Sequence, residues 1–152
     1  MQFQLPVHLI GISIRTSNNN NQAAQDIGAL WQRFYNDAIA EQIPNTISNN
    51  IIAVYTDYES DYTGAYTTII GFPVEHLKII PEGFVGRTFN NGSYKKIIAK
   101  GKLPEAVVEA WKAIWKQDNK IKRTYIADFE VYPKATQEGT FDEVYLYIGE
   151  QA

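Results

Sequence analysis

The 152-residue sequence contains no cysteine, which excludes thiol catalysis, disulfide bonds and thiolate metal sites. Its two histidines, His8 and His76, are isolated and lack the paired spacing of metal ligands, so structural or solvated roles are expected for both. Glycines such as Gly64, Gly83 and Gly92 stand singly, and none belongs to a phosphate-binding loop. We therefore expect neither a metal nor another cofactor.

Charge and long apolar runs are also scarce. Charged residues make up 20% of the chain and the net charge is −3, with no basic block of the kind that phosphate binding requires. The apolar runs are far shorter than the roughly 20 residues of a membrane span, and the N-terminus lacks the basic and apolar regions of a signal peptide. The sequence therefore predicts a cytoplasmic protein that binds neither nucleic acid nor membrane.

The most informative feature that is present is a repeated tripeptide. Asp57-Tyr58-Glu59 and Asp128-Phe129-Glu130 each end a short apolar run, and each is followed by a turn and a second apolar run that closes on glycine. A helical stretch that contains tryptophan precedes each of them. With 45% apolar residues the chain can bury a real core. We interpret it as one domain, residues 1–152, built of two repeats at about 1–75 and 82–152.

Apolar periodicity predicts the same element order in both halves, namely strand, helix, strand, strand. In the first half these elements are expected at residues 5–15, 22–42, 51–59 and 65–74. In the second half they are expected at residues 94–99, 104–118, 123–133 and 141–149. The order predicts an α+β fold, with two helices on one face of a largely antiparallel sheet and a ligand cleft between the two units.

Two local features refine this prediction. The apolar residues of the first strand change phase next to Gly11, which indicates a β-bulge. Residues 84–89 are typical of a further strand, and Asn90-Asn91-Gly92 predicts a hairpin turn that pairs this strand with residues 94–99.

Alternation along residues 123–133 separates two faces of that strand. One face carries Ala127, Phe129 and Val131, and we expect it to pack against a helix. The other face carries Asp128, Glu130 and Tyr132, and we expect it to point away from the helix.

The neighbouring strands extend the acidic face. If the last two strands form a hairpin, Tyr145 and Tyr147 lie beside Glu130, and Tyr55, Asp57 and Glu59 form the equivalent face in the first half. Aromatic faces attract cations by about 0.5–2 kcal/mol each, and a partly desolvated carboxylate adds a full opposite charge. The same residues also suit an ordinary solvated sheet face, since tyrosine is a good strand former, and the pattern leaves both interpretations open.

Several motifs, taken in order, resemble the gyrase-inhibitor-like, AraC-type effector-binding domains. These domains also form the drug-sensing part of bacterial multidrug-responsive transcription regulators. The likeness covers nearly the whole chain, and its stand-alone form is similar to cationic-drug-binding members carried on mobile integron cassettes. The motifs are Gly11-Ile12-Ser13-Ile14-Arg15-Thr16, Leu30-Trp31-x-x-Phe34, Tyr55-Thr56-Asp57-Tyr58, Asn91-Gly92-x-Tyr94, Ala110-Trp111-x-x-Ile114-Trp115 and Asp128-Phe129-Glu130-Val131-Tyr132.

The resemblance implies a tandem pair of strand–helix–strand–strand units that bind bulky, cationic and aromatic compounds in the cleft between them. It implies that Glu130 supplies the negative charge and that aromatic residues surround it. The lining residues that it indicates are Tyr55, Tyr132, Tyr145 and Tyr147, with an edge of Trp111, and its second-rank candidates are Asp57, Glu59 and Asp128.

Two alternatives to simple binding or sequestration remain. The regulators carry a DNA-binding helix-turn-helix segment for which this chain has no spare length, so any regulatory role is expected to act through a partner protein. Some relatives are hydrolases of reactive small molecules, and Glu130 would then be the catalytic base, which requires a raised pKa or a positioned water.

Overall fold

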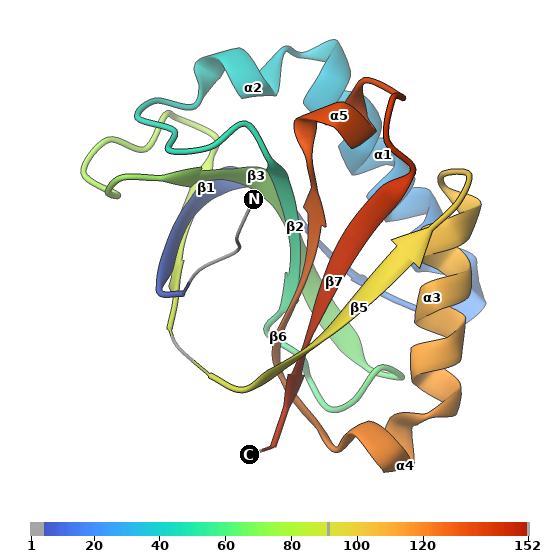
Figure 1. The fold of residues 1–152 in the computed structure, drawn as a ribbon. Helices are drawn as coiled ribbons and strands as arrows, with labels where there is room; N and C mark the ends of the chain where they lie inside the picture. The colour runs from blue at the N-terminus through green and yellow to red at the C-terminus, as the bar shows by residue number, and fades with distance from the viewer. Residues whose placement is uncertain (1–4, 91, 152) are drawn as a thin grey trace.

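The computed structural model describes residues 5–90 and 92–151 and shows helices packed on one face of a strongly curved sheet (Figure 1). The strands are β1 (Val7–Ser17), β2 (Ile51–Thr56), β3 (Ala65–Val74), β4 (Val85–Phe89), β5 (Tyr94–Lys100), β6 (Arg123–Tyr132) and β7 (Glu143–Glu150). The helices are α1 (Gln22–Asn36), α2 (Ile39–Gln42), α3 (Glu105–Lys116), α4 (Asp118–Ile121) and α5 (Lys134–Gln137), with a 3-10 turn, η1, at Asn19–Asn21. The strands pair antiparallel, which confirms the predicted α+β class.

The strands follow the order β4-β1-β3-β2-β6-β7-β5. Apart from β4, this order is symmetric about the central β2–β6 pair. Counted outward from that pair, β2, β3 and β1 on one side correspond to β6, β7 and β5 on the other. At the centre, Thr56 of β2 lies directly opposite Ala127 of β6, and each of these residues comes just before its copy of the repeated tripeptide. The arrangement supports our interpretation of two repeats, which stays a prediction together with its boundaries at 1–75 and 82–152.

The predicted hairpin between residues 84–89 and 94–99 is wrong. β4 pairs with β1 and β5 pairs with β7, at opposite ends of the strand order. The Asn-Gly signal is only a local turn preference, whereas each strand gains an antiparallel partner elsewhere in the sheet; Asn91 itself lies outside the described residues. Sheet curvature still brings the two edges together, because Phe89 of β4 and Tyr94 of β5 both pack on the Phe129 ring, at 5.4 and 5.7 Å between centroids.

The predicted bulge at Gly11 is also wrong. β1 pairs with β3 without a shift of register from His8 to Ser17. The phase change in the sequence arises because β1 is buried on both faces, with Leu9 packed inside the curve of the sheet and Ile10 packed beneath the helices. Gly11 lies opposite Gly71, where the two backbones approach so closely that neither position leaves room for a Cβ.

Both long helices form where apolar residues recur at helical spacing. Leu30 and Phe34 of α1 are buried against the sheet, and in α3 the Pro104 N-cap and a last-turn lysine, Lys116, suit a helix start and end. The helix expected over residues 22–42 is interrupted, because Ala38 adopts a positive φ of 48° between α1 and α2. No helix in the described ranges has the length and apolar character that crossing a membrane requires.

Candidate functional site

A cavity of about 930 Å³ lies between α1 and α3, over the central strands of the sheet. Its lining contains all three tryptophans of the chain and six of the ten tyrosines. These aromatic residues are Trp31, Trp111, Trp115, Tyr35, Tyr55, Tyr58, Tyr62, Tyr66 and Tyr132. Among the described residues, Glu130 is the only acidic side chain in the lining, and Lys112 and Arg123 are the basic ones.

Glu130 is held at the floor of this cavity by three aromatic donors. The Tyr55 hydroxyl and the Trp111 indole N–H donate to Glu130 Oε2 at 2.7 and 2.6 Å, and the Tyr132 hydroxyl donates to Oε1 at 2.5 Å. The side chains come from three elements, since Tyr55 lies on β2, Trp111 on α3 and Tyr132 on β6. The carboxyl group is therefore fixed in place, with neutral aromatic groups as its hydrogen-bond partners.

Glu130 is 2% exposed, and burial is the main influence on the pKa of its carboxyl group. Loss of hydration raises the pKa of this carboxyl above its ordinary value of 4.5, while the hydrogen bonds from Tyr132, Tyr55 and Trp111 act in the opposite direction. The neighbouring phenols stay protonated, because burial and the nearby Glu130 charge raise the pKa of Tyr66 to about 12. Burial and Glu130 also raise the pKa values of Tyr55 and Tyr132 well above 10.

The prediction that the acidic face of residues 123–133 points away from the helices is wrong. Glu130 lies on the helix side, opposite Leu146, whereas Phe129 lies opposite Tyr147 and packs inside the curve of the sheet. Both faces of β6 are buried, since Phe129 and Glu130 are 0% and 2% exposed. A strand covered on both sides gives no alternation between core and solvent, so its pattern could not show which face meets the helices.

Comparison with known proteins gives this cavity a family context. The Cass2 family, described as integron-associated effector-binding proteins, matches residues 6–149. The chain belongs to this family. The match confirms the resemblance to effector-binding domains and to their cassette-encoded members, and it supports small-molecule binding as the function.

Three individual proteins are similar to this chain. The integron cassette protein VCH_CASS2 from the mobile metagenome of Vibrio cholerae is 30% identical, with a TM-score of 0.76 over 95% of this chain and 90% of that one. YobU of Bacillus subtilis (strain 168), named as a candidate transcriptional regulator, is 29% identical over 91% of this chain and 88% of its own length. SAV2435, solved bound to tetraphenylphosphonium, shares the fold at 21% identity, with a TM-score of 0.79 over 100% and 95% of the two chains.

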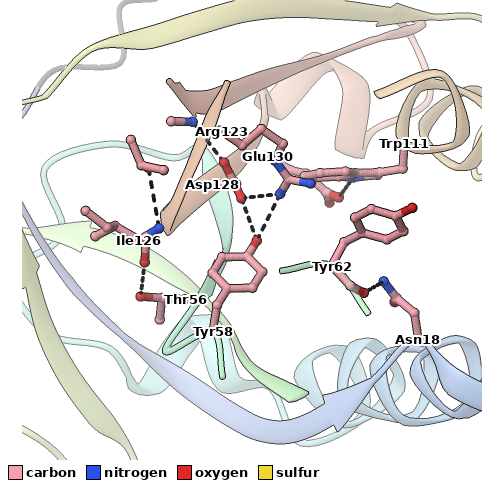
Figure 2. A network of polar contacts seen from close by, with 11 residues as sticks. Asn18, Thr56, Tyr58, Tyr62, Trp111, Arg123, Ile126, Asp128 and Glu130 are labelled. Carbon is pink, nitrogen blue, oxygen red and sulfur yellow. Dashed lines mark hydrogen bonds and ion pairs between the residues drawn. The ribbon is translucent and has the colours of Figure 1, made fainter. Parts of the chain in front are cut away.

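In this chain, Asp128 belongs to a buried network beside Glu130 and does not line the cavity (Figure 2). Its Oδ2 accepts hydrogen bonds from Arg123 Nη2 at 2.7 Å and from the Tyr58 hydroxyl at 2.5 Å. Its Oδ1 accepts the Gly149 N–H at 2.8 Å. Asp128 therefore positions two residues, Arg123 and Tyr58, that do line the cavity.

Four further candidates lie away from the cavity. Tyr145 and Tyr147 lie on the other face of the sheet, where Lys96 Nζ is 4.5 Å from the Tyr145 ring centroid, so the expectation that they adjoin Glu130 is wrong. In the first half of the chain the Asp57 carboxylate pairs with Arg87 at 2.9 Å, and Glu59 is exposed. The binding roles of all four residues stay predictions, and none of the four lines the cavity.

Sequence reasoning missed several lining residues. Trp31 and Trp115 lie at helical spacing that is equally typical of core residues, yet both line the cavity. Tyr62 comes from the turn between β2 and β3 and stacks on Trp115 with 5.8 Å between ring centroids. The concentration of every tryptophan on two amphipathic helices was the available signal. The described residues bring together no three His, Asp or Glu side chains able to hold a metal ion.

Proposed function

We propose that this protein binds bulky, lipophilic aromatic cations in the cavity between α1 and α3, with the Glu130 carboxylate as their counter-charge. The observation that carries the proposal is a buried carboxyl group whose three hydrogen-bond partners are neutral aromatic side chains. Burying a carboxylate without a cationic partner costs free energy. A cationic ligand that enters the cavity is attracted to this charge and offsets part of that cost.

The hydrogen bonds to Glu130 also extend its negative potential over the aromatic rings that line the cavity. A phenol or indole that donates to a carboxylate becomes more electron-rich, and an electron-rich ring face attracts cations more strongly. Tyr55, Tyr132 and Trp111 all line the cavity while donating to Glu130. The ligand therefore meets negative potential over several ring faces, which favours recognition by charge and shape over recognition by a fixed hydrogen-bond pattern.

The neighbour SAV2435, bound to tetraphenylphosphonium, supports a ligand of this class on this fold. The hydrolase alternative would use the same Glu130 as a base. Burial raises the pKa of this carboxyl, as a base requires, but both of its oxygens already accept hydrogen bonds from aromatic donors. These hydrogen bonds stabilise the ionised form, which favours an electrostatic role over proton abstraction.

The charge requirement is tested with tetraphenylphosphonium and tetraphenylborate, two ions of nearly the same shape and opposite charge. Because all three tryptophans line the cavity, their fluorescence reports directly on occupancy. We expect the phosphonium to quench this fluorescence saturably and the borate to bind at least about a hundredfold more weakly. Equal affinity for the two ions would remove the role of the carboxylate charge.

A further inference from the structure

Arg123 is the first residue of β6 and lies next to Glu130 (Figure 2). Like the site at Glu130, its surroundings combine one carboxylate with several aromatic rings. Its Nη2 lies 2.7 Å from Asp128 Oδ2, and the two side chains are 1% and 0% exposed. Its guanidinium carbon lies 4.3 Å from the ring centroid of Tyr125, 5.9 Å from that of Tyr58 and 5.7 Å from that of Trp111. The protein therefore already holds one cation of its own by the same two features that are proposed for its ligand.

The two arrangements are adjacent and share a wall. Asp128 and Glu130 are alternate residues on one face of β6, which places their side chains roughly 7 Å apart along the strand. The Trp111 indole donates its N–H to Glu130 and offers its ring face to the Arg123 guanidinium. Arg123 lines the same cavity as Glu130. A ligand that fills the cavity therefore meets a carboxylate at one position and a fixed guanidinium at the next.

We infer that Arg123 is a specificity-determining residue, which restricts this cavity to ligands with one positive charge and rejects compounds with a second cationic centre about 7 Å from the first. The inference rests on the proposed binding of cations at Glu130. Like charges at this separation between apolar aromatic walls repel each other, and the rings of Tyr58 and Trp111 beside the second position already lie within cation–π range of Arg123. The ligand class is thus a large monocation whose remaining body is neutral.

The test compares p-xylylene-bis(trimethylammonium) with 4-neopentylbenzyl-trimethylammonium, in which one quaternary nitrogen is replaced by carbon without a change of shape. Affinities are measured by tryptophan fluorescence and calorimetry. We expect wild-type protein to prefer the monocation by at least about tenfold. In Arg123→Gln, the Asp128 carboxylate becomes available as a second counter-charge, and the preference should shrink by at least about tenfold.

The double variant Arg123→Gln/Asp128→Asn is the matched control. It lacks the guanidinium and also the second carboxylate, so we expect the preference for the monocation to be restored. A dication that binds Arg123→Gln and the double variant equally well would overturn the role assigned to this pair.

If the variants do not fold, measurements on the wild-type protein alone still test whether the cavity rejects a second cationic centre. A third probe carries its second trimethylammonium on a long alkyl chain that can reach solvent, and it should bind nearly as well as the monocation. Equal weakness of the short and long dications, or equal affinity for the short dication and the monocation, overturns the inference and leaves the proposed function intact. Failure of the monocation itself to bind would instead contradict the proposed function.

Discussion

The Tyr55 hydroxyl donates a 2.7 Å hydrogen bond to Glu130 Oε2 across the junction between β2 and β6. Tyr55 belongs to the first half of the sequence and Glu130 to the second, so the carboxylate is held from both sides of the central strand pair. A cavity formed in this way depends on the pairing of the two halves, because neither half supplies both the charge and the complete set of aromatic donors.

Replacing Glu130 by glutamine should remove the charge and preserve the shape of the cavity floor. Glutamine keeps an acceptor oxygen for the aromatic donors, so we expect only a small change in stability. The affinity for tetraphenylphosphonium should fall at least about tenfold, because the cation loses the full counter-charge of a buried carboxylate. Fluorescence titration of the two proteins measures this difference.

Glu59→Gln is the matched control, because Glu59 is the corresponding carboxylate in the first copy of the tripeptide and is exposed outside the cavity. It changes the net charge by the same amount without touching the site. Loss of affinity in both variants would mean that overall charge, and not the position of Glu130, determines cation binding.

The contrast between Glu59 and Glu130 shows what the sequence pattern can predict and what it cannot. The repeated tripeptide predicted both positions, but in the first repeat Asp57 adopts a positive φ of 51° and β2 ends at Thr56, so Glu59 leaves the sheet. In the second repeat β6 continues to Tyr132 and carries Glu130 into the centre of the fold. Tertiary pairing, which the tripeptide does not encode, decides between the two outcomes.

The order of helices and strands could be predicted because apolar periodicity is a local property. The partners of β4 and β5 could not, because edge pairing depends on contacts between residues distant in sequence. The face of β6 that meets the helices was also beyond a pattern argument, since Phe129 and Glu130 are both buried. Glu130 itself was indicated by chemistry and family resemblance, whereas the Arg123–Asp128 pair gave no sequence signal that separates it from surface charges.

The affinity for cations should depend on pH through Glu130. Burial raises the pKa of this carboxyl in the folded protein, so it ionises only as pH rises beyond its ordinary value of 4.5. Binding of tetraphenylphosphonium should therefore strengthen with pH through this window, and bound cation should lower the pKa and release protons. Calorimetry in buffers of different ionisation enthalpy counts those protons, and a flat affinity profile would contradict the assignment.

The stability of the free protein should change with pH in the opposite sense. A carboxyl with a raised pKa in the folded state binds its proton more tightly there than in the unfolded chain. Its contribution to stability is complete below the unfolded pKa and is lost as pH rises through the folded pKa. The free energy of unfolding of wild type minus that of Glu130→Gln should thus decrease from about pH 4 to pH 8. A difference that stays constant would show that Glu130 titrates normally.

Removing one aromatic donor should weaken the control of Glu130 without removing its charge. In Tyr132→Phe, Oε1 loses its 2.5 Å hydrogen bond, so the pKa of Glu130 should rise further and the midpoint of the cation-binding profile should shift to higher pH. Stability should fall by about 1–3 kcal/mol because a buried acceptor loses its partner. Tyr147→Phe, on the other face of the sheet, should leave the binding profile unchanged, and an equal shift in both variants would contradict the location of the site.

The Gly11–Gly71 pair between β1 and β3 should be intolerant of any side chain. Gly11 and Gly71 lie opposite each other, and a Cβ at Gly71 would be 2.0 Å from the Ile10 carbonyl oxygen. This obstacle is backbone, which cannot rotate away, so Gly71→Ala should lower the free energy of unfolding by about 3 kcal/mol or more in urea denaturation. Gly28→Ala in α1 is the matched control, because its Cβ meets nothing within 4 Å and alanine should stabilise the helix by about 0.5–1 kcal/mol. Similar stabilities for the two variants would show that the strands separate more easily here than their register implies.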